Sequence, residues 1–500
     1  MKFFFQKSKR KSSLKETHSE KTDTVPVKAE DDKESFYYNS ETGLHFSIRY
    51  ISTLVHQEVI EKNILPFLLN KPFTAIHDVK KILPIEDVQI ETDEALIDEK
   101  LFNGYIVLKI DTDQQHFAFI AAKEVIVRSL AEPEVETAVI GPKEAFIEAI
   151  DQNINLLRSR LPVKEVMVEE YTIGSVSKTR TALMYISNIA NMENVNTVRE
   201  RLQAIDFDQI NDSAYIEQII ADNKNSPFPQ LLDTERPDRA AAALVEGKVV
   251  VVVDGSPHAL IGPTNLVEFF SSSEDYLLNW IMASGLRLIR LFAGVFFILI
   301  TPVYVAVLTY HYELIPKDLT ATLITSRQTI PFPPILEVLI LEITIELLRE
   351  AGARLPTKIG QTIGIVGGIV IGTASVEAGL TSNVLLILVA LAALASFATP
   401  VYKMGNTIRF LRFPFLLFAQ IWGLLGVVFC LLIITAHLLR LTSLGRPYLE
   451  PLYPPRWKDL KDSFVRASFA KQIRRPSYLQ AQKPIRFSPE KQKRHRDIEE

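Results

Sequence analysis

Acidic side chains interrupt an otherwise apolar segment at residues 335–350, and their type and spacing are suited to chemistry with cations. The segment is predicted to be a helix, and at 100° per residue Glu342, Glu346 and Glu350 fall on one side of it. Carboxylates at membrane depth are costly and normally face a bundle interior or water, so this face is predicted to line or support a cation path. The alternative is an amphipathic helix that lies at the membrane interface.

A regular stripe of glycines follows this helix. Gly360, Gly364, Gly368 and Gly372 repeat every four residues, and Glu377 stands at the end of the stripe. Small residues at this spacing let helix backbones approach closely in lipid, where no hydrophobic force drives helices together. The stripe therefore predicts a helix contact, either between copies of the chain around a symmetric axis or, within one subunit, with the alanine-rich helix that follows. Both alternatives are open.

These residues belong to a region after residue 285 in which the apolar side chains of the chain are concentrated. Residues 291–310 carry no charged side chain, and a helix of this length extends about 30 Å, enough to cross the hydrocarbon core of a bilayer. We therefore predict a multi-pass α-helical membrane domain over residues 286–440. Its spans are predicted at 286–310, 360–378, 381–399 and 413–440.

Positive charges near the ends of the spans bear on whether the helix at 335–350 also crosses. If it does, the lysines and arginines between residues 349 and 412 lie on the cytoplasmic side, which favours five spans. Five spans would, however, place the basic tail 441–500 outside, although residues 445–500 contain 14 Lys or Arg against 7 Asp or Glu. The two arguments conflict, and the sequence alone leaves the fifth crossing open.

The part of the chain before the apolar region is predicted to be a two-lobed α/β (or α+β) soluble domain, with lobes at 38–160 and 161–280. Apolar runs such as "GYIVLKI" and "HFAFIAA" alternate with amphipathic helical stretches. The five valines at 249–253 have no polar alternation and predict a central strand that is covered on both faces. Residues 1–37 are polar and are predicted to form a disordered tail with basic and mixed charge.

Several kinds of function receive no support from the sequence. It contains no H-E-x-x-H pair, no G-x-x-x-x-G-K-[ST] loop and no G-x-S-x-G elbow, so no enzymatic activity, cofactor or metal is predicted. The formal net charge of −4 predicts no bulk affinity for nucleic acid. The first residues lack the apolar run of a secretory signal, so the soluble domain is expected on the cytoplasmic side.

Four stretches carry a resemblance to a known family. They read "GPKEAFIEAIDQNINLLRSRL", "ERPDRAAAALVEGKVVVVVDGSPHALIGPTNLVEFFSSSEDYL", "PFPPILEVLILEITIELLREAGARLP" and "IGQTIGIVGGIVIGTASVEAGL". They resemble the A subunit of the GerA family of bacterial spore germinant receptors. The resemblance covers roughly residues 38–455 and leaves both tails outside.

The resemblance implies a multi-pass protein of the inner spore membrane that senses nutrients together with a transporter-like B subunit and a lipoprotein C subunit. Small germinants such as amino acids or sugars would be bound by the B subunit. The A subunit would associate into a ring that conducts monovalent cations within the membrane lipid. In that role Glu342, Glu346 and Glu377 would concentrate cations, and the glycine stripe would set how closely the pore helices approach.

Two other functions remain open from the sequence. A secondary transporter would use the Pro- and Gly-interrupted helices as a midplane substrate site, but the two halves of the membrane region show no inverted repeat. A non-conducting scaffold or signalling subunit would only anchor its partners. A scaffold should tolerate charge reversal at Glu342 or Glu346, whereas a channel should change its selectivity or conductance.

Overall fold

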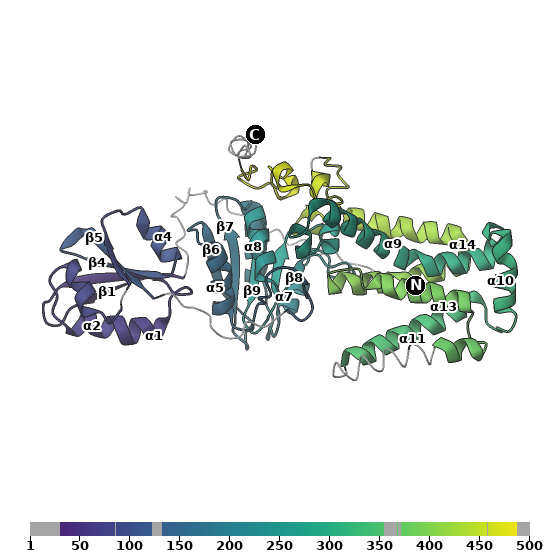
Figure 1. Ribbon diagram of the computed structural model, residues 1–500, viewed down its shortest axis with the longest axis horizontal. Coiled ribbons are helices and arrows are strands. Elements are labelled where there is room, and N and C mark those ends of the chain that lie inside the picture. Colours follow the sequence, from purple (N-terminus) through teal and green to yellow (C-terminus); the bar gives the residue numbers. More distant parts are fainter. Residues whose placement is uncertain are drawn as a thin grey trace, which may run out of the picture.

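The computed structural model describes most of the chain, from Asp31 to a point near the C-terminus (Figure 1). Two β-sheets with their helices lie at one end of an elongated molecule, and a region of long helices lies at the other. The described residues are 31–85, 87–122, 133–354, 368, 372–457 and 459–487.

The first lobe is built on a five-stranded antiparallel sheet in the order β1-β2-β4-β5-β3. Alternate residues of its strands face several short helices on one side and a single helix on the other, as the period of a half-buried strand requires. The strands are β1 (Asp32–Tyr38), β2 (His45–Ile51), β3 (Val88–Glu91), β4 (Tyr105–Ile110) and β5 (Asp113–Ala121), and the α-helices are α1 (Gln57–Val59), α2 (Leu65–Asn70), α3 (Val79–Ile82) and α4 (Leu96–Phe102). β1 starts inside the segment predicted as a tail, because residues 32–38 pair with β2 along their whole length.

The second lobe has its own five-stranded antiparallel sheet, in the order β6-β7-β9-β10-β8, between two pairs of helices. The prediction of a central strand at 249–253 is confirmed, because all five valines are buried and alternate between two hydrophobic clusters. The strands are β6 (Val166–Ile173), β7 (Thr179–Ile186), β8 (Leu232–Thr234), β9 (Val249–Val253) and β10 (Ala259–Gly262), and the helices are α5 (Ile150–Arg160), α6 (Met192–Gln203), α7 (Ser213–Ile220) and α8 (Pro237–Glu246).

The predicted lobe boundary at residue 160 assigns helix α5 to the first lobe, but the structure places this helix in the second lobe. Its apolar side chains, Ile154 and Leu157 among them, pack into the core of the second lobe beside α8. Its polar side faces the first lobe, where the Arg158 guanidinium pairs with Asp31 at 2.6 Å and both side chains are almost completely buried. The helix therefore belongs to the core of the second lobe and ties the first lobe to it.

Five helices with defined bounds follow the second lobe in the part of the chain that the structure describes: α9 (Trp280–Tyr310), α10 (Lys317–Arg327), α11 (Pro334–Arg354), α13 (Asn383–Ser396) and α14 (Tyr402–Arg440). Among the described residues, α9 and α14 are long and apolar enough to cross a membrane. The 14 residues of α13 extend about 21 Å, which is shorter than the span predicted at 381–399. Most of the span predicted at 360–378 lies outside the described residues, although 372–377 are helical.

Helix α14 is a hairpin of two antiparallel halves, 402–422 and 424–440, rather than the single span predicted at 413–440. The chain reverses at Gly423, whose φ of 59° and ψ of −138° are not helical. Beyond the turn, Cys430 packs in one cluster with Ala419, and the rings of Phe418 and Phe429 lie 5.8 Å apart. The sequence could not predict this turn, because a glycine inside an apolar run occurs equally at turns and at positions where helices pack closely.

The helical region begins and ends beside the second lobe. Near that lobe, Gly294 of α9 faces Phe270 and Ile408, and at the far end the Tyr310 hydroxyl donates to the carbonyl oxygen of Gln420 at 2.8 Å. The second half of α14 then returns, because the His437 Nε2 atom lies 2.8 Å from the Ser226 hydroxyl of the second lobe. After α14, residues 441–487 run back along the second lobe (yellow in Figure 1).

Candidate functional site

A buried ion pair joins three helices in the middle of the helical region. Glu342 of α11 is completely buried, and its carboxylate pairs with Arg412, which comes from the first half of α14 and is 2% exposed. The Arg412 guanidinium also lies 4.4 Å from the centre of the Phe297 ring of α9. The carboxylate predicted to face water is therefore compensated inside one subunit.

Glu346 extends this cluster by one helical turn. Its carboxylate pairs with Arg349 of the same helix and lies 3.7 Å from Arg412. A cavity of about 70 Å³ borders the cluster, which is space for a few water molecules or a small ion. Its lining includes Phe297, Glu342, Arg349, Ser396 and Arg412. Glu342 and two arginines thus line a small, partly polar void, and Glu346 lies beside Arg412.

The structure separates the remaining predicted residues from this cluster. Glu377 is exposed, and none of the ion pairs found among the described residues joins it to Arg412. Gly372 is buried, and a Cβ there would lie 3.7 Å from Leu386 of α13, so this position of the stripe makes a contact within the subunit. Gly368 is exposed, and none of the described atoms comes within 4 Å of its Cβ position. Gly360 and Gly364 lie outside the described residues.

Sequence reasoning missed the basic partners of the buried acids. Arg412 was assigned to the end of a span, whereas the first half of α14 begins at Tyr402 and places Arg412 ten residues inside it. Glu337, on the preceding turns of α11, is completely buried and accepts from Arg327 of α10 at 2.7 Å. The available signal was charge complementarity, since a buried acid at this depth requires a cation nearby.

A second polar cluster lies where the second lobe meets α14. The Lys403 ammonium pairs with Glu217 of α7 and lies 3.1 Å from Asp233. A cavity of about 400 Å³ opens beside it, between α7, residues 223–230 and the first turns of α14. Burial raises the pKa of the Glu217 carboxyl above its ordinary value, and the nearby lysine opposes this effect. The cluster connects the soluble lobe directly to a helix of the helical region.

Comparison with known proteins identifies the family of this chain. The family described as "Bacillus/Clostridium GerA spore germination protein" matches residues 13–478, which is nearly the whole chain. The chain belongs to the GerA family. This GerA-family chain is 49% identical over 443 residues to spore germination protein GerQA of Bacillus cereus, covering 89% of each protein. It is 40% identical to spore germination protein A1 of Bacillus subtilis, covering 85% of this chain and 88% of that protein.

One solved structure has a similar sequence to the soluble part of this GerA-family chain. It is the N-terminal domain of the A subunit of the Bacillus megaterium spore germinant receptor GerK3, at 27% identity. The match covers 47% of this chain and 89% of that domain, with a TM-score of 0.34.

Lys403→Met is expected to destabilise this GerA-family chain by about 1–3 kcal/mol at pH 8, and by less at pH 5. Without the lysine, the pKa of Glu217 rises further above its value in the unfolded chain. The folded state then binds more protons than the unfolded state, so its stability falls as the pH increases through that pKa. Thermal unfolding of the purified protein in detergent, measured at both pH values, tests this.

The matched control for this prediction is Lys403→Met combined with Glu217→Gln, which should remove most of the pH dependence. An unfolding temperature of Lys403→Met that differs from the native one equally at pH 5 and pH 8 would contradict the assignment.

Proposed function

We propose that this chain is the A subunit of a nutrient germinant receptor and that copies of it form a cation channel together with partner subunits. Its membership of the GerA family carries the receptor role, because its relatives are spore germination proteins over almost their whole length. The channel role is supported by α11, which holds Glu342 and Glu346 inside the helical region beside a small cavity.

The helical region is proposed to cross the inner spore membrane several times. Large apolar side chains cover its outside, for example Phe292 at 68%, Leu425 at 76% and Leu432 at 61% exposure. Surfaces of this kind are unfavourable in water and are satisfied by lipid. α9 and both halves of α14 are the best supported crossings, since each extends from the second lobe to the far end.

An even number of crossings removes the conflict that the sequence left open. The helical region starts and ends at the second lobe, so the basic tail after Arg440 lies on the same side as the soluble lobes. The excess of basic residues in the tail favours the cytoplasmic side. The turn at Gly423 supplies the additional crossing.

Association with other chains is proposed to complete the site. A transporter-like B subunit and a lipoprotein C subunit are the partners, and self-association forms the ring. The exposed Gly368 leaves a close-approach surface for a neighbouring helix, whereas Gly372 is already occupied by α13. The exposed Glu377 is the carboxylate best placed to meet cations, because none of the ion pairs among the described residues neutralises it in the way Arg412 neutralises Glu342.

A non-conducting scaffold is the second candidate, and a specific observation favours it. The cluster at Glu342 is balanced by Arg412 and Arg349, so it supplies no net negative charge to attract cations. In a scaffold this ion pair would only fix α11 against α9 and α14.

Nutrient-triggered cation flux in proteoliposomes that contain the three subunits separates the two functions. We expect flux with the native chain, and a reduced or less cation-selective flux with Glu377→Gln. The control is Glu313→Gln, which changes an exposed acid near the far end of α9 and should leave the flux unchanged. If no combination of partners and nutrient conducts, the scaffold is the better account.

A further inference from the structure

The last part of the described chain, residues 459–487, lies across the joint between the second lobe and α9. We call it the C-terminal strap. In Figure 1 it is the yellow segment that runs from the start of α9 back over the second lobe. Its far end is bound to the second lobe. The backbone N–H of Gln482 donates to the carbonyl oxygen of Ile189 at 2.8 Å, and the Arg486 side chain pairs with Glu246 at 2.9 Å. The chain folds back onto the lobe from which α9 departs.

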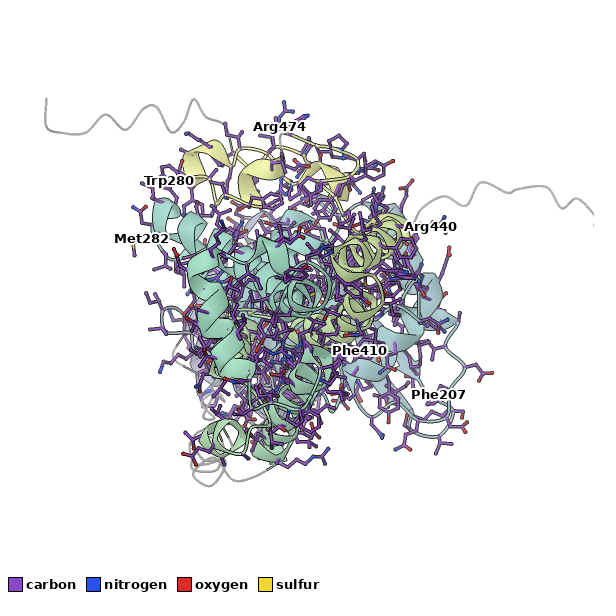
Figure 2. All side chains as sticks on the ribbon, turned by 90° about the vertical axis from the view of Figure 1, so that its right-hand side faces the viewer. Phe207, Trp280, Met282, Phe410, Arg440 and Arg474 are labelled. Atoms are coloured by element: carbon purple, nitrogen blue, oxygen red, sulfur yellow. The ribbon has the colours of Figure 1, made fainter. Side chains whose placement is uncertain are left out.

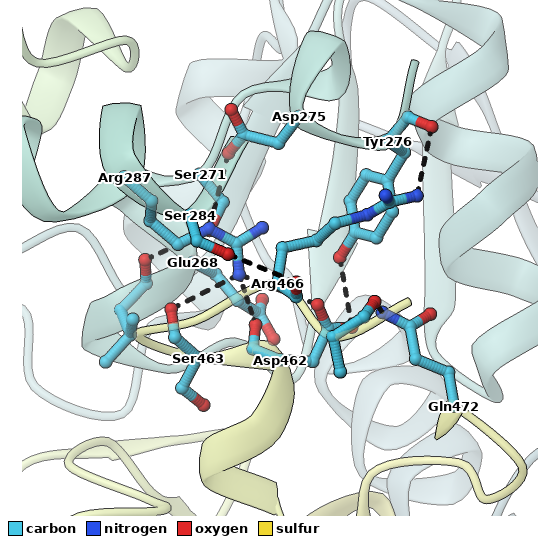
Figure 3. A network of polar contacts seen from close by, with 12 residues as sticks. Glu268, Ser271, Asp275, Tyr276, Ser284, Arg287, Asp462, Ser463, Arg466 and Gln472 are labelled. Atoms are coloured by element: carbon cyan, nitrogen blue, oxygen red, sulfur yellow. Dashed lines mark hydrogen bonds and ion pairs between the residues drawn. The ribbon is translucent and has the colours of Figure 1, made fainter. Parts of the chain in front are cut away.

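At the start of α9, the strap supplies the acceptors of a completely buried arginine (Figure 3). Arg287 donates to the backbone carbonyl oxygens of Asp462 and Ser463, the second at 3.2 Å. One helical turn earlier, the Ser284 hydroxyl lies 3.2 Å from the carbonyl oxygen of Arg466 and 2.6 Å from that of Trp280, to either of which it can donate its single proton. Two turns of α9 are therefore in polar contact with the backbone of the strap.

The strap also holds the connector 271–279, the covalent link between the second lobe and α9. Arg466 donates to the carbonyl oxygens of Tyr276 and Leu278 at 3.2 and 3.3 Å, and the Tyr276 hydroxyl donates to Asp462 at 3.2 Å. From the connector itself, the fully buried Asp275 accepts from Arg287 at 3.3 Å. Connector, helix and strap thus share one buried polar network, drawn in Figure 3.

Further along, the strap is anchored to the second lobe. The buried Tyr478 hydroxyl donates to Glu268, which also accepts from Lys248 at 2.5 Å. The side chain of Arg475 donates to the carbonyl oxygen of Val245, at the end of α8, at 2.7 Å. These contacts lie on the side of the joint opposite to Arg287, so the strap bridges the joint without being part of the covalent path.

We propose that the C-terminal strap is a coupling element that fixes α9 to the second lobe, so that a movement of the lobe is transmitted to the helical region. The connector and the packing of α9 against α14, whose Lys403 pairs with Glu217 of the second lobe, also hold α9, and the strap adds contacts at two of its first turns. With the strap in place, α9 cannot rotate or tilt against the lobe unless Arg287 leaves the acceptors that the strap provides. This inference rests on the proposed receptor function.

Several polar atoms of this network are buried without a hydrogen-bond partner among the described residues. They are Arg287 Nη2, Arg466 Nε and Asp462 Oδ1. Burial raises the pKa of Asp462 to about 6, with the charge of Glu246 acting in the same direction and Arg287 opposing it. A buried polar atom without a hydrogen-bond partner costs free energy, so the surrounding structure must hold this network in place.

A weakened strap and a covalent strap test the proposal in one protein. Tyr478→Phe with Arg486→Ala removes two anchors on the second lobe and leaves the Arg287 network intact. A Cβ built at Gly247 lies 3.3 Å from the Cβ of Ala481, close to the spacing in disulfides, so Gly247→Cys with Ala481→Cys can relock the strap. Cys430→Ala in all variants removes the native cysteine.

We expect the weakened strap to lower nutrient-triggered flux on the order of tenfold, a typical size for the loss of a coupling between two sites. Forming the disulfide in the weakened variant should restore the flux, and reducing it should remove the flux again. The reduced cysteine variant controls for strain at Gly247, whose φ is +101°. Arg474→Ala is the matched control, since this exposed strap arginine points away from the protein in Figure 2.

Hydrogen exchange of the first turns of α9 provides a readout that needs no conduction. It should become faster in the weakened variant and slow again when the disulfide forms. Unchanged exchange or unchanged flux in the weakened variant overturns the proposal. So does a disulfide that abolishes the response of an otherwise native chain, because the strap would then have to leave the lobe. If the native chain never conducts, the channel role fails while hydrogen exchange still decides the coupling.

Discussion

Replacing Arg412 by methionine is expected to destabilise the helical region by about 3–5 kcal/mol, because it leaves the carboxylate of Glu342 buried without its counter-ion. Both side chains are at most 2% exposed, and α11, α14 and α9 meet at this pair. Thermal unfolding of the detergent-solubilised protein should show a clear loss. Flux measurements alone would not separate this loss from a direct effect on a pore.

Two control variants make the Arg412 experiment decisive. Glu342→Met combined with Arg412→Met removes both charges, and it should be close to native or more stable, since well-packed apolar pairs often replace buried ion pairs without cost. Arg354→Ala breaks the exposed pair with Glu350 in the same helix and should cost less than about 1 kcal/mol.

The same experiment bears on the pore. If Arg412→Met were as stable as the native chain, Glu342 would have another source of compensation, such as water or a cation. That result would support the channel function of this helix face and count against the scaffold function. A large loss in the single variant, rescued in the double variant, would assign the pair to packing, and Glu377 would be the remaining candidate for cation contact.

Sequence periodicity predicted the helix that carries Glu342 and Glu346, and the strand at 249–253, because both follow from local spacing. It could not predict Arg412 as a partner, since the pairing depends on how α14 packs against α11, 70 residues away in the chain. For the same reason, the sequence could not predict that α5 belongs to the second lobe. An amphipathic pattern states that one face is buried, but it does not state against which sheet.

The C-terminal strap was predicted only as a basic tail, for a different physical reason. Its contacts use backbone carbonyls as acceptors, as at Asp462 and Ser463, and such contacts leave no pattern in the sequence. Its basic residues have structural tasks as well: Arg466 is 3% exposed, and its guanidinium lies 4.2 Å from the centre of the Phe469 ring. A count of positive charges therefore left the side of the membrane open and missed the attachment to the lobe.

Gly426→Ala is expected to prevent the two halves of α14 from closing, at a cost of about 3 kcal/mol or more, at the upper end of overpacking. A Cβ at Gly426 would overlap the carbonyl oxygen of Phe418, a backbone atom of the facing half that cannot move aside. Gly423→Ala should act in the same direction, because its φ of 59° and ψ of −138° are accessible to glycine and strained for other residues.

The measurement is the side of the membrane on which the C-terminal segment emerges. With Cys430→Ala as background, Lys483→Cys in the exposed end of the strap should react with an impermeant maleimide from the same side as Ser175→Cys at an exposed position of the second lobe. Gly426→Ala should reduce the labelling at position 483 or move it to the opposite side. Gly285→Ala is the control, since its Cβ meets none of the described atoms within 4 Å. If Lys483→Cys and Ser175→Cys already label from opposite sides in the native hairpin, the even number of crossings is wrong, and the basic tail cannot reach the lobe that the strap is proposed to hold.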